Sequence, residues 1–136
     1  MNNETSAVQS PATSKLALIV DDDAFSEAFI SEMLTELGVT EISSASSGRI
    51  ALQILSSLPR LPDILICDVF MPDMDGIEFL NELAQKGYQG GIILVSGLDT
   101  TIMSLAKDMA LANGLNLLGA FTKPVSMKVL ADALNL

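Results

Sequence analysis

The stretch Ile64-Leu-Ile-Cys-Asp68-Val-Phe-Met-Pro-Asp-Met-Asp-Gly76 decides the fold. Its first five residues form a short apolar run that ends in an acid, a pattern typical of a strand buried on both faces. A loop rich in Pro and Asp follows, and a helix is then expected over Ile77 to Lys86. Asp75 is the expected N-cap of that helix, with Glu78 three residues further on. The stretch therefore predicts a strand, a loop and a helix in that order.

The same unit is repeated on both sides of this stretch. Ala24–Leu37 is predicted to be a helix, because Phe25, Phe29, Met33 and Leu37 recur every four residues before Gly38. Ser126 is expected to cap a last helix, which has apolar residues on one face. The alternation predicts an α/β fold with a doubly wound, five-stranded parallel sheet. The other predicted strands are Leu16–Val20, Glu41–Ala45, Ile92–Ser96 and Leu117–Thr122, and the other predicted helices are Arg49–Leu58 and Thr100–Asn113.

Composition limits the class of protein. The chain has 136 residues, of which 49 % are hydrophobic, so one domain is expected over residues 16–136, preceded by a polar, flexible arm over residues 1–15. The longest apolar runs are too short to span a membrane, and the arm has no signal-peptide pattern. A single cysteine, Cys67, fits a cytoplasmic location and is expected to be a small core residue. The net charge of −10 argues against direct binding to nucleic acid or anionic lipid.

Polar side chains follow four of the predicted strands. Asp21, Asp22 and Asp23 come after the first strand, Asp68 ends the third, Ser96 ends the fourth, and Lys123 follows the fifth. In a parallel α/β sheet the ligand site lies beyond the carboxyl ends of the strands. Each residue alone has an ordinary structural explanation as a turn or cap residue. Their placement at the same edge of the sheet predicts a functional site.

The residue types of this site favour phosphoryl chemistry with a hard cation. Closely spaced carboxylates repel one another and need a cation to stay ionised. Oxygen ligands without histidine or cysteine point to Mg²⁺, with Mn²⁺ as the alternative. A cation, a lysine and a hydroxyl can neutralise and position a phosphoryl group, and a carboxylate nucleophile would form an acyl phosphate.

Four segments resemble the motifs of the response-regulator receiver family of two-component signalling. They are Val20-Asp21-Asp22-Asp23, the segment Cys67-Asp68-Val69-Phe70-Met71-Pro72-Asp73-Met74-Asp75-Gly76, Val95-Ser96-Gly97 and Thr122-Lys123-Pro124. They occur in the family's order between Leu16 and Leu136. The resemblance implies a (βα)₅ flavodoxin-like fold and a domain that catalyses only its own phosphotransfer and slow autodephosphorylation.

The resemblance also implies roles for individual residues. Asp68 would be the phosphoacceptor, and Ser96 and Lys123 would bind the phosphoryl group. Asp21, Asp22, Asp68 and the backbone carbonyl of Phe70 would hold Mg²⁺, and Lys123–Pro124 would be a cis peptide. The donor would be a phosphohistidine on a sensor histidine kinase or a phosphotransfer protein. The alternative is a degenerate receiver that acts as a phosphate-independent interaction module.

Other classes of protein fit the residues less well. An EF-hand aligned on Gly76 would have Met71 at its first ligand position, where an acid is needed. A flavodoxin needs a phosphate cradle after the first strand, where three aspartates would repel the phosphate. A haloacid-dehalogenase-like phosphatase needs a second acid two residues after its nucleophile, and Phe70 stands there.

The sequence departs from the common receiver pattern in two places. Receivers usually carry an aromatic residue three positions before the lysine, where this chain has Ala120, so a signal is expected to travel through the segment from Gly97 to Asn113 instead. Phe70 and Leu98, expected to flank the path of an attacking water, cannot hydrogen-bond it. The stretch from Gly114 to Gly119 resembles receivers attached to EAL-type cyclic-di-GMP phosphodiesterases. Such an output domain beyond the C-terminus, or a second copy of the chain, is an expected partner.

Overall fold

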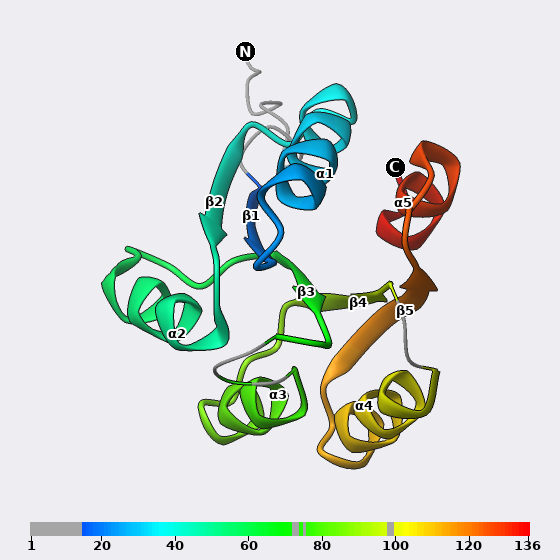
Figure 1. The fold of residues 1–136 in the computed structure, drawn as a ribbon. Coiled ribbons are helices and arrows are strands. Elements are labelled where there is room, and N and C mark those ends of the chain that lie inside the picture. Colours follow the sequence, from blue (N-terminus) through cyan, green and yellow to red (C-terminus); the bar gives the residue numbers. More distant parts are fainter. Residues whose placement is uncertain (1–14, 72–73, 75, 98–99) are drawn as a thin grey trace.

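The computed structural model describes residues 15–71, 74, 76–97 and 100–136. Five parallel strands form one sheet in the order β2-β1-β3-β4-β5 (Figure 1). The strands are β1 (Leu16–Val20), β2 (Glu41–Ala45), β3 (Ile64–Asp68), β4 (Gly91–Ser96) and β5 (Asn116–Thr122). The predicted parallel sheet is therefore confirmed, and the first three strands have the predicted bounds. The last two strands each begin one residue earlier than predicted.

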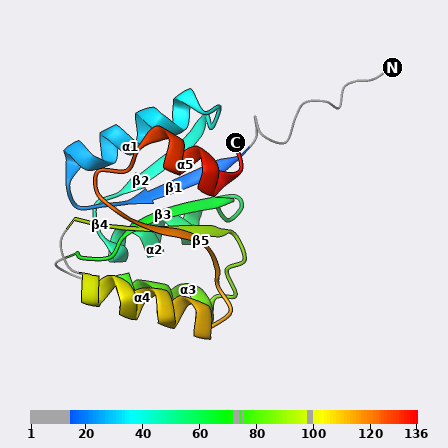
Figure 2. The same ribbon diagram turned by 90° about the vertical axis from the view of Figure 1, so that its right-hand side faces the viewer.

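Helices cover both faces of the sheet. Figure 2 shows α1 and α5 on one face and α2, α3 and α4 on the other. The helices are α1 (Ala24–Glu36), α2 (Gly48–Ser57), α3 (Gly76–Gln85), α4 (Thr100–Ala112) and α5 (Met127–Leu134). Each helix end that was predicted from the sequence lies within one residue of the predicted position. The doubly wound architecture is confirmed.

Burial of the strands follows from their position in the sheet. All residues of β1, β3 and β4 are buried, because helices cover both faces of these inner strands. The edge strands β2 and β5 are partly exposed. Alternate residues of the inner strands feed two cores, one under α2, α3 and α4 and the other under α1 and α5. Cys67 lies in the first core, as predicted, and helix methionines 33, 103, 109 and 127 pack in or against the cores.

The regular spacing of four apolar residues in α1 does not mark one buried face. Met33 is buried, but Phe25 is 82 % exposed and Phe29 is 43 % exposed. An α-helix has about 3.6 residues per turn, so a row of residues four apart winds around the helix and leaves the core. The residues of α1 that reach the core are instead Ile30, Met33 and Leu34.

Side-chain caps and glycines fix the helix ends. Ser126 accepts a hydrogen bond from the backbone N–H of Val129, which confirms the predicted cap of α5. Asp23 caps α1 in the same way. Gly38 follows α1 with φ of 99°, a conformation that favours glycine, and the helix ends just before it as predicted. The predicted cap at Asp75 and most of the predicted arm lie outside the described residues.

Candidate functional site

Three carboxylates meet at the carboxyl edge of the sheet. Asp21 and Asp22 follow β1 and Asp68 ends β3, and these two strands are parallel neighbours. One carboxylate oxygen of each residue lies within 4.8 Å of those of the other two. Asp21 and Asp68 are buried, at 3 % and 4 % exposed, whereas Asp22 is exposed. The structure therefore brings together the acidic residues that the sequence singled out.

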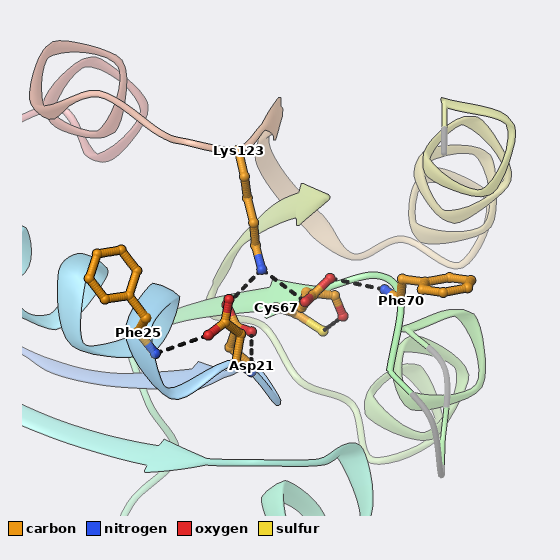
Figure 3. Close-up of polar contacts among 7 residues, drawn as sticks. Asp21, Phe25, Cys67, Phe70 and Lys123 are labelled. Atoms are coloured by element: carbon orange, nitrogen blue, oxygen red, sulfur yellow. Dashed lines mark hydrogen bonds and ion pairs between the residues drawn. The ribbon is translucent and has the colours of Figure 1, made fainter. Parts of the chain in front are cut away.

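Lys123 reaches this cluster from the edge strand β5. Its Nζ lies 2.9 Å from Oδ2 of Asp21 and 3.0 Å from Oδ2 of Asp68. Figure 3 shows the side chain extending from the end of β5 toward Asp21. The backbone N–H of Lys123 donates to the carbonyl of Ser96 at 2.9 Å, which fixes the end of β5 against β4. Lys123–Pro124 is a cis peptide, as expected from the resemblance.

Ser96 lies at the same edge, at the end of β4. It is buried, and β4 lies between the strands that carry Asp68 and Lys123. Ser96 is thus brought to the site, and its predicted role as a phosphoryl ligand stays a prediction.

Burial and crowding set the charges of the site. Burial raises the pKa of Asp68, and the negative charge of Asp21 adds to this effect. The N–H of Phe70 and the ammonium of Lys123 oppose it without cancelling it. Burial by itself lowers the pKa of Lys123, but the carboxylates of Asp21 and Asp68 outweigh burial and raise this pKa. The lysine is therefore held as a cation, while the ionised form of Asp68 is only partly compensated.

The carboxylates fit a divalent cation. Oδ2 of Asp21 is buried and has no hydrogen-bond donor among the described residues, and its contact with Lys123 is an ion pair without hydrogen-bond geometry. Its Oδ1 accepts from the backbone N–H of Asp23 at 2.9 Å. A buried oxygen without a donor is costly unless a charge compensates it. Together with the nearby oxygens of Asp22 and Asp68, it provides a donor set typical of Mg²⁺.

Phe70 forms one wall of the site. Its backbone N–H donates to Oδ1 of Asp68 at 3.0 Å, and its side chain is 57 % exposed. Figure 3 shows Phe25 and Phe70 on opposite sides of the cluster. A cavity of about 290 Å³ opens here, lined by Asp22, Asp23, Asp68, Phe70, Gly97 and Lys123. The predicted contact of the Phe70 carbonyl with a metal stays a prediction, and Leu98 lies outside the described residues.

The close approach of Val69 and Gly76 was not predicted from the sequence. The N–H of Gly76 donates to the carbonyl of Val69 at 2.8 Å, and a Cβ on Gly76 would lie 2.7 Å from the Cα of Val69. Only glycine allows this close approach of two backbone segments. The Asp-Gly dipeptide at Asp75 and Gly76 was the signal for a turn here. This contact joins the residue after Asp68 to the first residue of α3.

The fold and the site define a class of small α/β protein with an acidic, lysine-bearing centre at the carboxyl edge of a parallel sheet. Residues 17–135 match the response regulator receiver domain family. The match covers most of the chain, and the chain belongs to this family. The chain is a receiver domain of the response-regulator type, a family whose role is to accept a phosphoryl group.

Individual relatives support this assignment. The cyclic di-GMP phosphodiesterase RocR of Pseudomonas aeruginosa is 32 % identical over 111 residues, covering 82 % of this chain but only 28 % of RocR. The chemotaxis protein CheY of Thermotoga maritima is 30 % identical over 121 residues, covering 89 % of this chain and 95 % of CheY. A response regulator from Colwellia psychrerythraea has a structure with a TM-score of 0.74 and 32 % identity, covering 89 % of this chain and 94 % of that one.

The chain spans only about a third or less of some curated relatives, namely 28 % of RocR and 32 % of the Regulator of RpoS of Escherichia coli. The similarity to RocR agrees with the resemblance to phosphodiesterase-linked receivers noted in the sequence. Among the residues that the structure describes, every helix is too short or too polar to cross a membrane.

Proposed function

We propose that Asp68 is the residue that accepts the phosphoryl group, in a reaction that depends on Mg²⁺. The observation that carries this proposal is the contact of Lys123 with the buried carboxylates of both Asp21 and Asp68 at the carboxyl edge of the sheet. The donor is a phosphohistidine of a sensor histidine kinase or phosphotransfer protein. The reaction takes place in the cytoplasm, where the single thiol stays reduced.

In this proposal each residue has a defined task. A carboxylate oxygen of Asp68 attacks phosphorus, the bond from phosphorus to the donor nitrogen breaks, and the departing imidazole keeps that electron pair and takes a proton. The N–H of Phe70 orients the attacking carboxylate through Oδ1. Lys123 and the hydroxyl of Ser96 bind phosphoryl oxygens. Asp21, Asp22, Asp68 and the Phe70 carbonyl would hold Mg²⁺ or Mn²⁺, which when bound neutralises charge between the anionic carboxylate and the anionic phosphoryl group.

The attachment of the domain is a separate proposal. The similarity to RocR, a cyclic di-GMP phosphodiesterase, favours an EAL-type output domain beyond the C-terminus as the recipient of the signal. A second copy of the chain is the alternative recipient. The functional alternative is a receiver that works without phosphate as an interaction module.

The test uses acetyl phosphate as a small donor and intact mass as the readout. The wild-type protein is expected to gain one phosphoryl group with Mg²⁺ and none with a chelator. Asp68→Asn is expected to gain none, whereas Asp63→Asn, a change at the other end of β3, is expected to be labelled like the wild type. Equal labelling of Asp68→Asn would contradict the proposal. A wild-type protein that is folded but never labelled would favour the phosphate-independent alternative.

A further inference from the structure

Gly119 and Phe121 are in unusually close contact on β5. A Cβ built on Gly119 would lie 2.5 Å from Cζ and 2.7 Å from Cε2 of the Phe121 ring. The ring therefore occupies the space in which a side chain at position 119 would begin. Gly119 does not have a positive φ, unlike Gly38, Gly87 and Gly114. Glycine is required at position 119 for space and not for backbone conformation.

A register shift in β5 places this pair on the same row as Lys123. Ile92 pairs with Leu117 and Ile93 pairs with Gly119, so Leu118 is an extra residue. Phe121 then pairs with Val95 and packs against the core under α1 and α5, whereas Ala120 packs against the other core. Because side chains alternate along a strand, residues 119, 121 and 123 follow one another on one side. Lys123 is thus the next residue of this row after Phe121.

The side chain of Lys123 must pass over β4 to reach its two carboxylate partners. It starts on the edge strand β5, and β4 separates it from β3 and β1, which carry Asp68 and Asp21. Neighbouring strands are about 4.8 Å apart, so the side chain must extend inward over β4 to reach both carboxylates. A bulky group turned toward it from the preceding position of its row would obstruct this path. The ring of Phe121 is that neighbour, and it lies over Gly119 instead.

We propose that Gly119 is a positioning residue for phosphotransfer. Because position 119 has no side chain, the Phe121 ring lies back over it and stays away from Lys123, whose ammonium can then reach Asp21 and Asp68. A side chain at position 119 would displace the ring along the row toward Lys123. This inference rests on the proposed function, in which Lys123 binds the transferred phosphoryl group. It requires the Phe121 ring to stay in place during the reaction.

The chain offers a matched control for a test variant. In Gly119→Ala the new Cβ meets the Phe121 ring, near the site. In Gly91→Ala the new Cβ would meet Cδ1 of Leu118 at 2.4 Å, an equally close contact on the same pair of strands but at the start of β4, away from Lys123. Both variants therefore introduce a similarly close contact on the β4–β5 pair, but the Gly91 contact is with Leu118, which lies outside the row of Gly119, Phe121 and Lys123. In the double variant Gly119→Ala/Phe121→Leu the clashing ring is absent.

The experiment measures the rate of acetyl phosphate labelling at saturating donor, the Mg²⁺ affinity and the melting temperature of each variant. Gly119→Ala is expected to lower the maximal rate about tenfold, as for a catalytic group displaced by a fraction of an ångström. Its Mg²⁺ affinity is expected to stay within about twofold of wild type, because the three carboxylates do not move. Gly91→Ala is expected to lose as much stability as Gly119→Ala while keeping the wild-type rate. The double variant is expected to label as fast as Phe121→Leu alone.

Three results would overturn the inference. They are a wild-type rate in folded Gly119→Ala, equal slowing in Gly91→Ala, and a double variant that stays much slower than Phe121→Leu. The last comparison decides the question even if Gly119→Ala alone does not fold. A wild-type protein that is not labelled would instead contradict the proposed function itself, so the two failures are distinguishable.

Discussion

An aspartate lies at each end of β3, and the surroundings of the two aspartates shift their pKa values in opposite directions. Asp63, just before the strand, accepts from the backbone N–H of Leu16 at 2.8 Å and from Arg60 at 2.9 Å. Burial by itself raises the pKa of Asp63, but these donors outweigh burial and lower it. Asp68, at the other end, has a raised pKa because burial and Asp21 outweigh its donors. The surroundings at the amino end of β3 therefore stabilise the ionised form of Asp63, whereas those at the carboxyl end destabilise the ionised form of Asp68.

This difference shows how an ordinary structural aspartate is distinguished from a reactive one. Asp63 also connects three strands through its backbone, because its N–H donates to Leu16 and its carbonyl accepts from Gly91. The hydrogen-bonding groups of Asp63 therefore join the strands of the sheet. Asp68 is buried among other carboxylates, and its negative charge is only partly balanced by Lys123. A carboxylate in that state gains most from a bound cation or a phosphoryl group.

The largest expected effect is on cation binding at the carboxyl edge. Asp22→Ala should weaken Mg²⁺ binding about tenfold or more, equivalent to about 1.4 kcal/mol, because it removes one oxygen ligand and one charge. Asp63→Asn should leave the affinity unchanged, since that carboxylate lies at the other edge. Calorimetric titration measures both. Unchanged affinity in Asp22→Ala would mean that the acidic triplet is only a solvated loop.

The next largest effect is on the lifetime of the acyl phosphate. Hydrolysis needs a water in line with the bond to be broken, and the Phe70 side chain beside Asp68 cannot hydrogen-bond it. Phe70→Asn should speed dephosphorylation about threefold to tenfold, less than a full general base would provide. Phe25→Asn, on the opposite side of the cluster, serves as the control and should not change the rate. Loss of phosphate is followed by intact mass, and a rate in Phe70→Asn no higher than wild type would refute this role.

A smaller effect is expected on stability without divalent ions. Asp68→Asn should stabilise the fold and Asp63→Asn should destabilise it, each by about 1 kcal/mol or roughly 3 °C in melting temperature. The first change removes a buried charge that is only partly compensated, and the second removes a charged acceptor from Leu16 and Arg60. Thermal melts in a chelating buffer measure both. Changes in melting temperature of the same sign in both variants would contradict the proposed difference between Asp63 and Asp68.

The same pair of variants gives a pH dependence with opposite signs. The lowered pKa of Asp63 means that its contribution to stability is present above the unfolded pKa of about 4 and is lost as the pH falls through the folded value. The raised pKa of Asp68 means that its cost to stability grows as the pH rises from the unfolded value through the folded one. Both variants should therefore approach wild-type stability in acid. Melts repeated from pH 3 to about pH 7 measure this, and differences from wild type that persist in acid would count against it.

The smallest effect is a set of chemical shifts on activation. Ala120 has no side-chain rotamer to change, so beryllofluoride with Mg²⁺ should perturb amides of Gly97 and of α4 while the Phe121 ring keeps its environment. Ala120 packs on the side of the sheet that faces α4, and Phe121 packs on the other, as expected from the strand alternation. Amide and aromatic NMR spectra report both regions. A shifted Phe121 ring with α4 unperturbed would show that the signal takes another route.

Much of the fold and of the site could be predicted from the sequence because the relevant signals are local. The apolar runs of β1, β3 and β4 reflect burial on both faces. The chain direction alone places the last residue of each strand, and the residue that follows it, at the carboxyl edge, and this holds for β5 as well. This is enough to bring Asp21, Asp68 and Lys123 together. The exposure of Phe25 and Phe29 was not predicted, since a row of residues four apart gives no measure of which part of it reaches the core.

The unpredicted features depend on contacts between distant atoms. The opposite pKa shifts of Asp63 and Asp68 arise from Leu16, with the neighbouring Arg60, at one end and from Asp21 and Lys123 at the other, and only the folded chain brings Leu16 to Asp63 and Lys123 to Asp68. The extra residue Leu118 in β5 and the ring of Phe121 over Gly119 depend on pairing with β4. Neither has a signature in the spacing of apolar residues.

The position of the phosphoryl group tests the central claim most directly. After treatment with acetyl phosphate and Mg²⁺, borohydride reduces an aspartyl phosphate to homoserine, a stable mark that fragment-ion mass spectrometry assigns to one residue. The mark is expected at position 68 and at neither position 63 nor positions 21 to 23. A mark at any of those other positions, or none in a folded protein that binds Mg²⁺, would contradict the assignment of Asp68 as the phosphoacceptor.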